Sequence, residues 1–196
     1  MQDTLITVLS EKMMPIAELN DSVYATRGFN IIATANNRDK GVNELSSALK
    51  RRFNVVVLPL PGDLEQEVAI VVKRVGEMSQ NLELPAPKNV AEEVARVVAI
   101  FREMRGGATA DGKMTLKSPS GTLSAAEAIG VVIGGLSHAA FFNDGKLSAE
   151  GIASSMVGAI VKDPVQDKAV LEEYLETVLK KRPAYADYYH ALSDMA

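Results

Sequence analysis

The chain has 196 residues, enough for one domain and a small second one. It contains no cysteine, which excludes disulfide scaffolds, thiolate metal sites and cysteine nucleophiles. The formal net charge of −4 argues against a dedicated nucleic-acid binder, because such proteins usually carry a basic excess.

The beginning of the chain predicts a helix followed by a hairpin. Residues 3–12 carry apolar side chains at helical spacing, and Pro15 ends that helix. Residues 14–18 and 22–26 have the pattern of two paired strands with a polar turn between them.

Two apolar runs of strand length come next, residues 29–35 and 54–58. Each is almost continuously apolar, as expected of a strand that is covered on both faces. A short helix over residues 43–50, with Asn43 as its N-cap, separates the two runs and ends in the basic cluster of residues 50–52. We therefore expect an α/β segment with two central strands.

The sequence changes character at Pro61-Gly62, and everything after this point has helical patterns. The first predicted helix begins after an N-cap at Asp63. Further helices are predicted over residues 89–104, 124–142, 148–161, 166–181 and 184–193. Ser124 and Glu127 form a capping-box pattern. Small residues within 129–135 would let another helix approach closely, either in the helical core or at a partner surface. We place the boundary between the two parts near residue 61.

Asn36 and Asn37 directly follow the first apolar run. Ligands bind at the carboxyl ends of strands in open α/β sheets. A carboxamide there can donate a hydrogen bond to a γ-phosphate and accept one from the attacking water, which is the water-positioning role in nucleotide hydrolases. The alternative is that the two residues only form the turn after the strand. The residues alone leave both interpretations open.

Arg52 ends the basic cluster just before the second apolar run, so its guanidinium is expected at the edge of the sheet. In a ring of subunits, an arginine inserted from one subunit stabilises charge on the phosphoryl group transferred in the next, an effect on the order of 10³ to 10⁵ in rate. The alternative is a solvated basic helix terminus, which the helix dipole favours.

These segments are more specific together than apart. Three segments resemble the MoxR branch of the AAA+ ATPases. The first, QDTLITVLSEKMMPI, resembles the helix and hairpin after the acidic Mg²⁺ motif, and the second, FNIIATANN, resembles the sensor-1 strand. The third, LSSALKRRFNVVVLPLP, resembles the arginine-finger helix with the last core strand. LKSPSGTLSAAEAI resembles the start of the lid's sensor-2 helix. The resemblance implies an α/β plus all-α fold: the C-terminal part of a P-loop NTPase core in residues 1–61, then a helical lid in residues 62–196.

The resemblance also implies roles for single residues. Asn36 would be sensor 1 and Arg52 the arginine finger, with Arg51 as the fallback because the family often has an acidic residue there. In the lid, the position that contacts nucleotide in many members, and is often arginine, is here Ser120, while Lys117 lies nearby before the helix. A complete parent would bind ATP and Mg²⁺, and the resemblance assigns no metal ligand to this chain.

The family's phosphate-binding loop and acidic Mg²⁺ motif are not found in the sequence. Residues 107–113 satisfy G-x-x-x-x-G-K, but a helix precedes them, Met114 takes the place of the hydroxyl residue, and Pro119 comes before any helix can run. We interpret this segment as a flexible loop between lid helices. His138 and His190 are far apart and lack clustered carboxylates, so they predict no metal site.

The resemblance implies ATP hydrolysis in a ring, a hexamer, that remodels a protein partner in a chaperone-like way, commonly one with a von Willebrand factor A domain. We expect this chain, as a C-terminal piece, not to hydrolyse ATP alone. The alternative is a non-enzymatic helical interaction module or a truncated reading frame. Nucleic-acid remodelling is disfavoured by the acidic balance.

The sequence also suggests where the chain works and how it behaves when isolated. The N-terminus lacks a basic signal region, and the longest apolar stretch, residues 129–142, is interrupted and too short to span ~30 Å of hydrocarbon. We therefore expect a cytoplasmic chain without membrane contact. The two predicted strands would expose their edges and apolar faces, so we also expect association or poor solubility.

Overall fold

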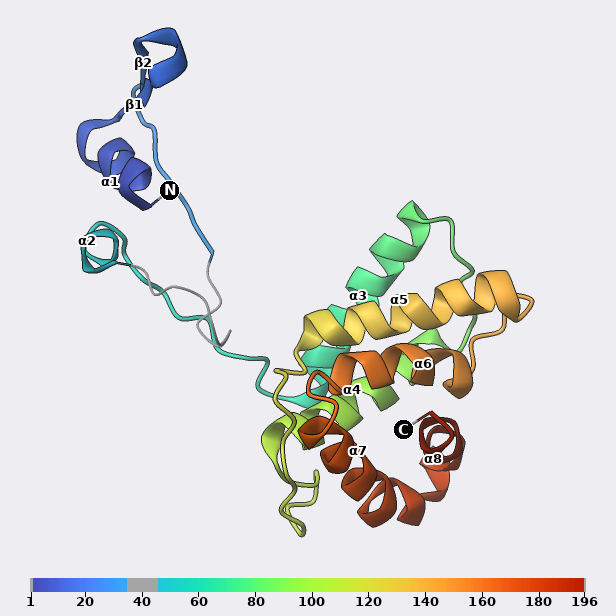
Figure 1. The fold of residues 1–196 in the computed structure, drawn as a ribbon. Coiled ribbons are helices and arrows are strands. Elements are labelled where there is room, and N and C mark those ends of the chain that lie inside the picture. The colour runs from blue at the N-terminus through green and yellow to red at the C-terminus, as the bar shows by residue number, and fades with distance from the viewer. Residues whose placement is uncertain (1, 35–45, 196) are drawn as a thin grey trace. The chain divides into compact units, whose positions relative to one another are not determined.

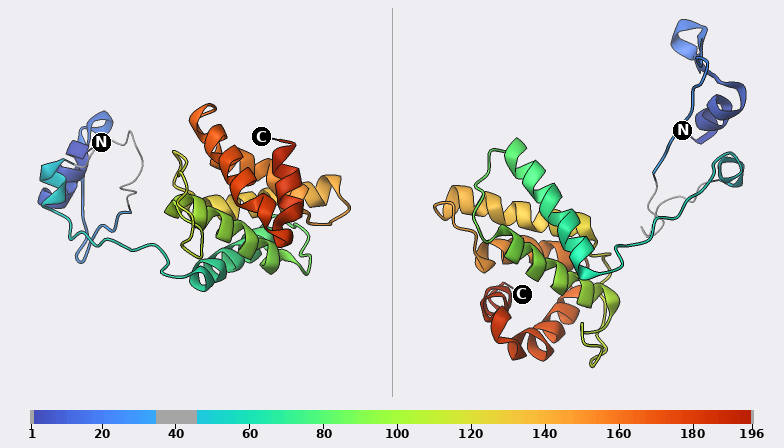
Figure 2. Two further views of the ribbon diagram at one scale, coloured as in Figure 1. Left: turned by 90° about the horizontal axis from the view of Figure 1, so that it is seen from below. Right: turned by 180° about the vertical axis from the view of Figure 1, so that it is seen from behind.

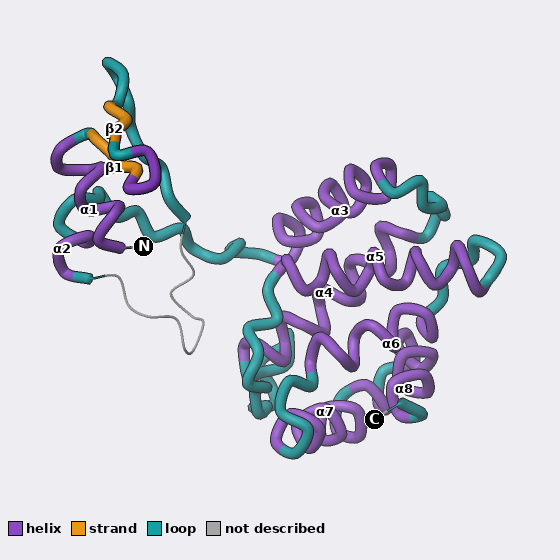
Figure 3. Tube along the Cα trace, turned by 45° about the horizontal axis from the view of Figure 1, so that its top comes forward, coloured by secondary structure: helices purple, strands orange, loops and turns teal. Residues whose placement is uncertain are grey.

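The computed structural model describes residues 2–34 and 46–195. The chain divides into two compact units, Met1–Pro59 and Leu60–Ala196. This division lies close to the boundary expected near residue 61. Figure 3 shows the described strands in the first unit and the long helices in the second.

The first unit contains a short helix and a hairpin (Figure 1). Helix α1 spans Gln2–Glu11, and strands β1, Met13–Ile16, and β2, Asp21–Tyr24, pair antiparallel. Between them lies a 3₁₀ turn, Ala17–Leu19, followed by Asn20 in the left-handed conformation (φ 48°). Asparagine tolerates this conformation well, which suits it to the turn. The predicted helix and hairpin are confirmed, although the turn takes residues 17–18 out of the first strand.

Helix α2 is a single turn, Ser47–Lys50. The hydroxyl of Ser46 accepts a hydrogen bond from the Leu49 amide and so caps the first turn. Leu49 is completely buried and anchors the turn in its unit. The predicted N-cap Asn43 lies outside the described residues.

The two predicted central strands are wrong as far as the structure describes them. Residues 29–34 and 54–58 have no strand pairing, and the described part of the chain contains one sheet, the β1–β2 pair. Ile32 is 93% exposed and Leu58 is 85% exposed. The physical reason is that a strand forms only when a neighbour takes its backbone hydrogen bonds and another layer covers its side chains. The described residues provide neither for these runs.

The second unit is built from helices, and the predicted helices are confirmed. Most predicted helix ends lie within four residues of the observed ends. The helices are α3 Leu64–Asn81, α4 Val90–Gly106, α5 Ala125–Phe142, α6 Ala149–Ile160, α7 Gln166–Thr177 and α8 Ala186–Ser193. Two 3₁₀ turns, Leu179–Lys181 and Pro183–Tyr185, join α7 to α8. The predicted last turn of α7 is therefore a 3₁₀ turn.

Side-chain caps explain where several helices begin. The Asp63 carboxylate accepts from the Gln66 amide at 2.8 Å, and Ser148 accepts from the Gly151 amide at 3.3 Å. Ser124 and Glu127 form the predicted capping box at the start of α5.

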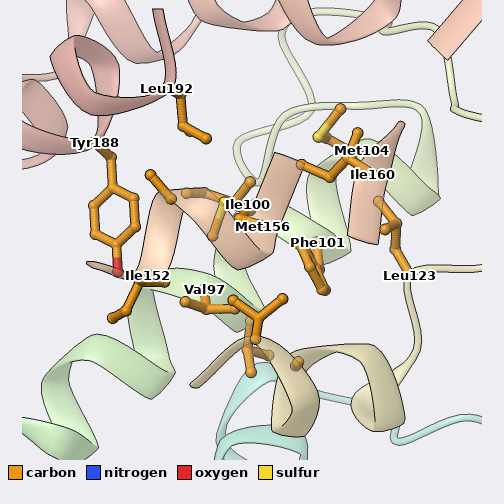
Figure 4. Packing of buried hydrophobic residues seen from close by; sticks show 14 of the residues in the cluster. Val97, Ile100, Phe101, Met104, Leu123, Ile152, Met156, Ile160, Tyr188 and Leu192 are labelled. Atoms are coloured by element: carbon orange, nitrogen blue, oxygen red, sulfur yellow. The ribbon is translucent and has the colours of Figure 1, made fainter. Parts of the chain in front are cut away.

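The core of the second unit lies between α4, α6 and α8, with further side chains from α3, α5 and α7. Figure 4 shows these side chains converging between the helices. Completely buried members include Val97, Phe101 and Met104 of α4, Ile152, Met156 and Ile160 of α6, and Tyr188 and Leu192 of α8. Burying one large apolar side chain contributes roughly 1.5–3 kcal/mol, so this cluster is a major source of the unit's stability.

Helices α5 and α6 run side by side at very close range (Figure 2). A Cβ placed on Gly135 would lie 2.6 Å from Cγ1 of Ile152, and one on Gly134 would lie 2.2 Å from Oγ of Ser155. The small residues of 129–135 thus serve the helical core, one of the two alternatives left open by the sequence.

Helix α5 has 18 residues and a mean hydropathy of 1.5, which makes it long and apolar enough to cross a membrane by length and composition. We expected the longest apolar stretch, residues 129–142, to be too short to span a membrane. That expectation was wrong, because the apolar helix already begins at Ala125. A core helix passes the same test, and α5 packs against α3, α4 and α6.

Candidate functional site

Arg52 is positioned by the single turn of α2. Its backbone amide donates to the Leu49 carbonyl at 2.9 Å, directly after the turn that buried Leu49 anchors. Its guanidinium donates through Nε to Oγ of Ser10 at 2.7 Å and through Nη1 to the carbonyl of Ala48 at 2.8 Å. Both acceptors are neutral, and no carboxylate among the described residues pairs with Arg52. The positive charge of Arg52 is therefore uncompensated within the described part of its unit.

Arg51, the fallback for the same role, is the C-cap residue of α2 and is exposed. Its backbone amide donates to the Ser47 carbonyl at 3.2 Å. The two arginines thus differ in that contacts to α1 and α2 orient the guanidinium of Arg52.

Asn36, the predicted sensor 1, lies outside the described residues, and so does Asn37. The sensor-1 role of Asn36 therefore stays a prediction.

Ser120, the position at which the resemblance implies a nucleotide contact, is bound to another part of the second unit. Its backbone amide donates to Oδ1 of Asp167 and its hydroxyl to Oδ2, each at 2.7 Å. Lys117, the nearby lysine, forms an ion pair with Glu173 at 2.8 Å. The polar groups of both residues therefore have partners inside the second unit.

Asp167 was missed by sequence reasoning, because an acidic residue in the first turn of a helix is common. It is completely buried, and its oxygens accept four hydrogen bonds: two from Ser120 and one each from the amides of Lys162 and Asp163. Burial alone would raise the pKa of Asp167, but the hydrogen bonds from Asp163 and Ser120 outweigh it and lower the pKa to about 2. Asp167 is thus an internal anion that ties α7 to the loop before α5.

A second buried carboxylate, Glu67, holds the beginning of the helical unit together. It is 1% exposed, and its oxygens accept from Arg102 at 2.9 Å and from Arg105 at 2.8 and 3.0 Å. Arg105 also donates to the Leu123 carbonyl at 2.7 Å, just before α5. Burial would raise the pKa of Glu67, but its hydrogen bonds with Arg105 and Arg102 lower it overall. Long-range pairs of this kind carry no spacing signal in the sequence.

The segment that satisfies G-x-x-x-x-G-K is not built as a phosphate-binding loop. Helix α4 precedes it and ends against Gly107 in the left-handed conformation (φ 66°). Ala108 and Thr115 then form an antiparallel bridge, and the next helix begins at Ala125. A phosphate-binding loop requires a strand before it and a helix N-terminus directly after it. The interpretation as a loop between two helices is confirmed, although hydrogen bonds within the loop hold it in one shape where we expected flexibility.

The two histidines lie in different parts of the second unit. His138 is half-buried on α5, with its Nδ1 close to Gly151 of α6 and its ring 5.5 Å from that of Phe142. His190 is exposed on α8. Within residues 2–34 and 46–195, no three His, Cys, Asp or Glu side chains are placed to hold a metal ion.

Comparison with known proteins shows which family the chain belongs to. Residues 65–192 match the model of the YehL-like AAA+ ATPase C-terminal domain, which covers well over half of the chain. The chain belongs to this family. Residues 1–53 of this YehL-like chain match the AAA domain of the dynein-related subfamily.

A relative from Escherichia coli (strain K12), "Uncharacterized protein YehL", is 35% identical over 198 residues. The match covers 97% of this chain but 53% of the relative, so the chain spans about half the length of that protein. No solved structure matches. The helices α3 to α8 lie almost entirely within the match to the YehL-like C-terminal domain, which identifies the second unit as the C-terminal helical part of an AAA+ ATPase.

Proposed function

We propose that this chain forms the C-terminal part of an ATP-hydrolysing AAA+ ATPase of the MoxR type. The observation that carries this proposal is the order of the two family matches along the chain. An AAA domain match ends at residue 53, directly after Arg52, and a C-terminal AAA+ helical domain follows. An arginine at the end of the core match, with no carboxylate partner in the described residues, suits the arginine-finger role.

Arg52 would act on a nucleotide held by the next subunit of a ring, a hexamer. Its guanidinium is exposed and bound to two neutral oxygens. Both bonds are exposed, so water can replace them, and charge-assisted bonds to a phosphate would compensate for their loss when the guanidinium reorients. A guanidinium at the transferring phosphoryl group stabilises the charge that develops there.

Asn36 would orient the attacking water. Its carboxamide can accept a hydrogen bond from the water and donate one to the γ-phosphate, as a water-positioning residue does. ATP and Mg²⁺ would be held by a phosphate-binding loop and an acidic motif that these 196 residues do not contain. When bound, Mg²⁺ neutralises phosphate charge. In the lid, Ser120 would support α7 through Asp167 in place of contacting nucleotide through an arginine.

The work done by hydrolysis would be chaperone-like remodelling of a protein partner. The MoxR resemblance of residues 3–61 supports this part of the proposal, and it points to a partner with a von Willebrand factor A domain.

ATP turnover by two proteins tests the proposal. One is this chain alone, and the other is a chimera in which it replaces the matched half of the E. coli relative. We expect no turnover by the chain alone and clear turnover by the chimera. Asn36→Ala should lower turnover while ATP affinity is kept, and the control Asn30→Ala, on the same segment, should change neither. Turnover by the chain alone that disappears with Asn36→Ala would refute the proposal.

A second candidate is a non-enzymatic interaction module made by the helical unit. It is favoured by the completeness of that unit: within the described residues, one buried side-chain nitrogen, Nε of Arg96, lacks a hydrogen-bond partner. The nucleotide sequence upstream of Met1 separates the candidates. An in-frame or frameshifted G-x-x-x-x-G-K-[ST] followed by an acidic motif favours a truncated enzyme, and its absence favours the module.

A further inference from the structure

A cavity lies between the loop after α4 and the end of α7. Its volume is about 280 Å³, and the loop contributes Thr109, Asp111, Lys113 and Met114 to its walls. The other wall is formed by Thr177, Val178, Lys181 and Arg182, at and just after the end of α7. The loop belongs to the segment that resembles a phosphate-binding motif without being one. Figure 1 shows it beside α7.

The loop is held in shape by its own hydrogen bonds. The Thr109 amide donates to the Met114 carbonyl at 3.0 Å, and the Gly112 amide donates to the Thr109 carbonyl at 2.8 Å. The Thr109 hydroxyl donates to Oδ1 of Asp111 at 2.6 Å. These bonds close a tight hairpin, so Lys113 is presented from an ordered turn.

The charges around the cavity do not cancel. Arg182 is paired with buried Glu103 through two hydrogen bonds of 2.9 Å. Lys113 is paired with Asp111 at 3.4 Å, and both side chains are largely exposed. Lys181 has no ion pair with any described residue. One positive charge is therefore left over at the cavity, in a chain whose overall charge is −4.

We propose that this cavity binds a compact oxyanion, a phosphate or a carboxylate group, through Lys181 and Lys113. The lining also includes two apolar residues, half-buried Met114 and buried Val178. The cavity falls just below the usual range of about 300–1,000 Å³ for ligand pockets, so its occupant is a small anion or the anionic end of a larger ligand. This site is separate from the proposed nucleotide chemistry of Arg52 and does not depend on it.

Titration of the 196-residue chain with inorganic phosphate and, separately, with succinate tests the site. Backbone amide signals would be followed by NMR at constant ionic strength. We expect saturable shifts at Lys113 and Lys181. If phosphate alone gives them, the site takes phosphate groups; if succinate alone gives them, it takes carboxylates; both results support the proposal.

Neighbouring lysines provide matched variants. Lys181→Gln should weaken anion binding by about tenfold, the effect of losing one charge-assisted contact. Lys180→Gln is the control, because Lys180 is paired with Glu176 at 2.7 Å and does not line the cavity. Far-UV circular dichroism would confirm that both variants are folded. Shifts that do not saturate, or binding that Lys181→Gln leaves unchanged, would overturn the proposal.

Discussion

Asp167 accepts both the backbone amide and the hydroxyl of Ser120, each at 2.7 Å. Position 120 is where the MoxR resemblance places a nucleotide-contacting residue, often an arginine. In this chain the same position is used to join the loop before α5 to the first turn of α7. A buried carboxylate with four donors is a strong local constraint, so the contact favours a role for Ser120 in the internal structure of the helical unit.

Replacing Asp167 by asparagine should destabilise the helical unit by about 2–4 kcal/mol. The asparagine side chain would place an NH₂ group where one carboxylate oxygen now accepts hydrogen bonds, so buried backbone donors would lose their acceptor. Urea denaturation of the chain measures this change. Asp163→Asn is the matched control. Asp163 caps α7 through the amides of Val165 and Gln166, and asparagine caps equally well, so only a few tenths of a kcal/mol should be lost. Equal losses in the two variants would contradict the assigned role of Asp167.

The stability of the unit should fall in acid. The pKa of Asp167 is lowered from 3.8 to about 2, and the pKa of Glu67 and that of Glu103 are also lowered. A folded-state pKa below the unfolded value means that the unfolded chain takes up protons first, so stability present at neutral pH is lost as pH falls from about 4 to 2. Urea midpoints measured between pH 7 and pH 2.5 should show this loss. Asp167→Asn should flatten the curve below pH 4; an unchanged slope in that variant would count against the prediction.

Glycines 130 and 135 on α5 should respond to alanine in opposite directions. A Cβ on Gly135 would lie 2.6 Å from Cγ1 of Ile152 and 3.2 Å from Leu147, so Gly135→Ala should cost about 1–3 kcal/mol through overpacking. A Cβ on Gly130 meets nothing within 4 Å, so Gly130→Ala should stabilise the helix by up to about 1 kcal/mol. Thermal unfolding of the two variants decides this; a stabilising Gly135→Ala would show that α5 and α6 do not approach as closely as described.

The helical unit was predictable from the sequence because its signals are local. Ser124 and Glu127 are three residues apart and cap α5 as their spacing predicts, and Asp63 and Ser148 do the same for α3 and α6. The contacts that join these helices were not predictable. Glu67 meets Arg102 and Arg105 across more than thirty residues, and no spacing rule connects them.

The strands were mispredicted for a related reason. An apolar run such as residues 54–58 indicates a segment that could form a buried strand, but strand pairing also requires a neighbouring strand. Nothing within the run shows whether that neighbour is present. In the candidate site, the run and Arg52 were therefore recognisable, while the lack of strand pairing around them was not.

The exposed apolar runs should make the chain associate. Val56 is 78% and Leu58 is 85% exposed, and unpaired apolar segments of this kind join other chains. Replacing both residues by lysine should shift the chain toward monomer in size-exclusion chromatography with light scattering. Val165→Lys is the control, because Val165 is equally exposed, at 81%, but lies in the helical unit. A stable monomer of the unaltered chain would contradict the prediction.

The most direct test of the central claim is ATP turnover by the chimera with single arginine substitutions. Arg52→Ala should lower turnover by roughly 10³ to 10⁵ while ATP affinity changes little, because an arginine finger acts on the transition state. Arg51→Ala should change turnover only slightly, and Lys73→Ala, on the exposed face of α3, should have no effect. Turnover that survives Arg52→Ala, or that is lost instead with Arg51→Ala, would contradict the assignment.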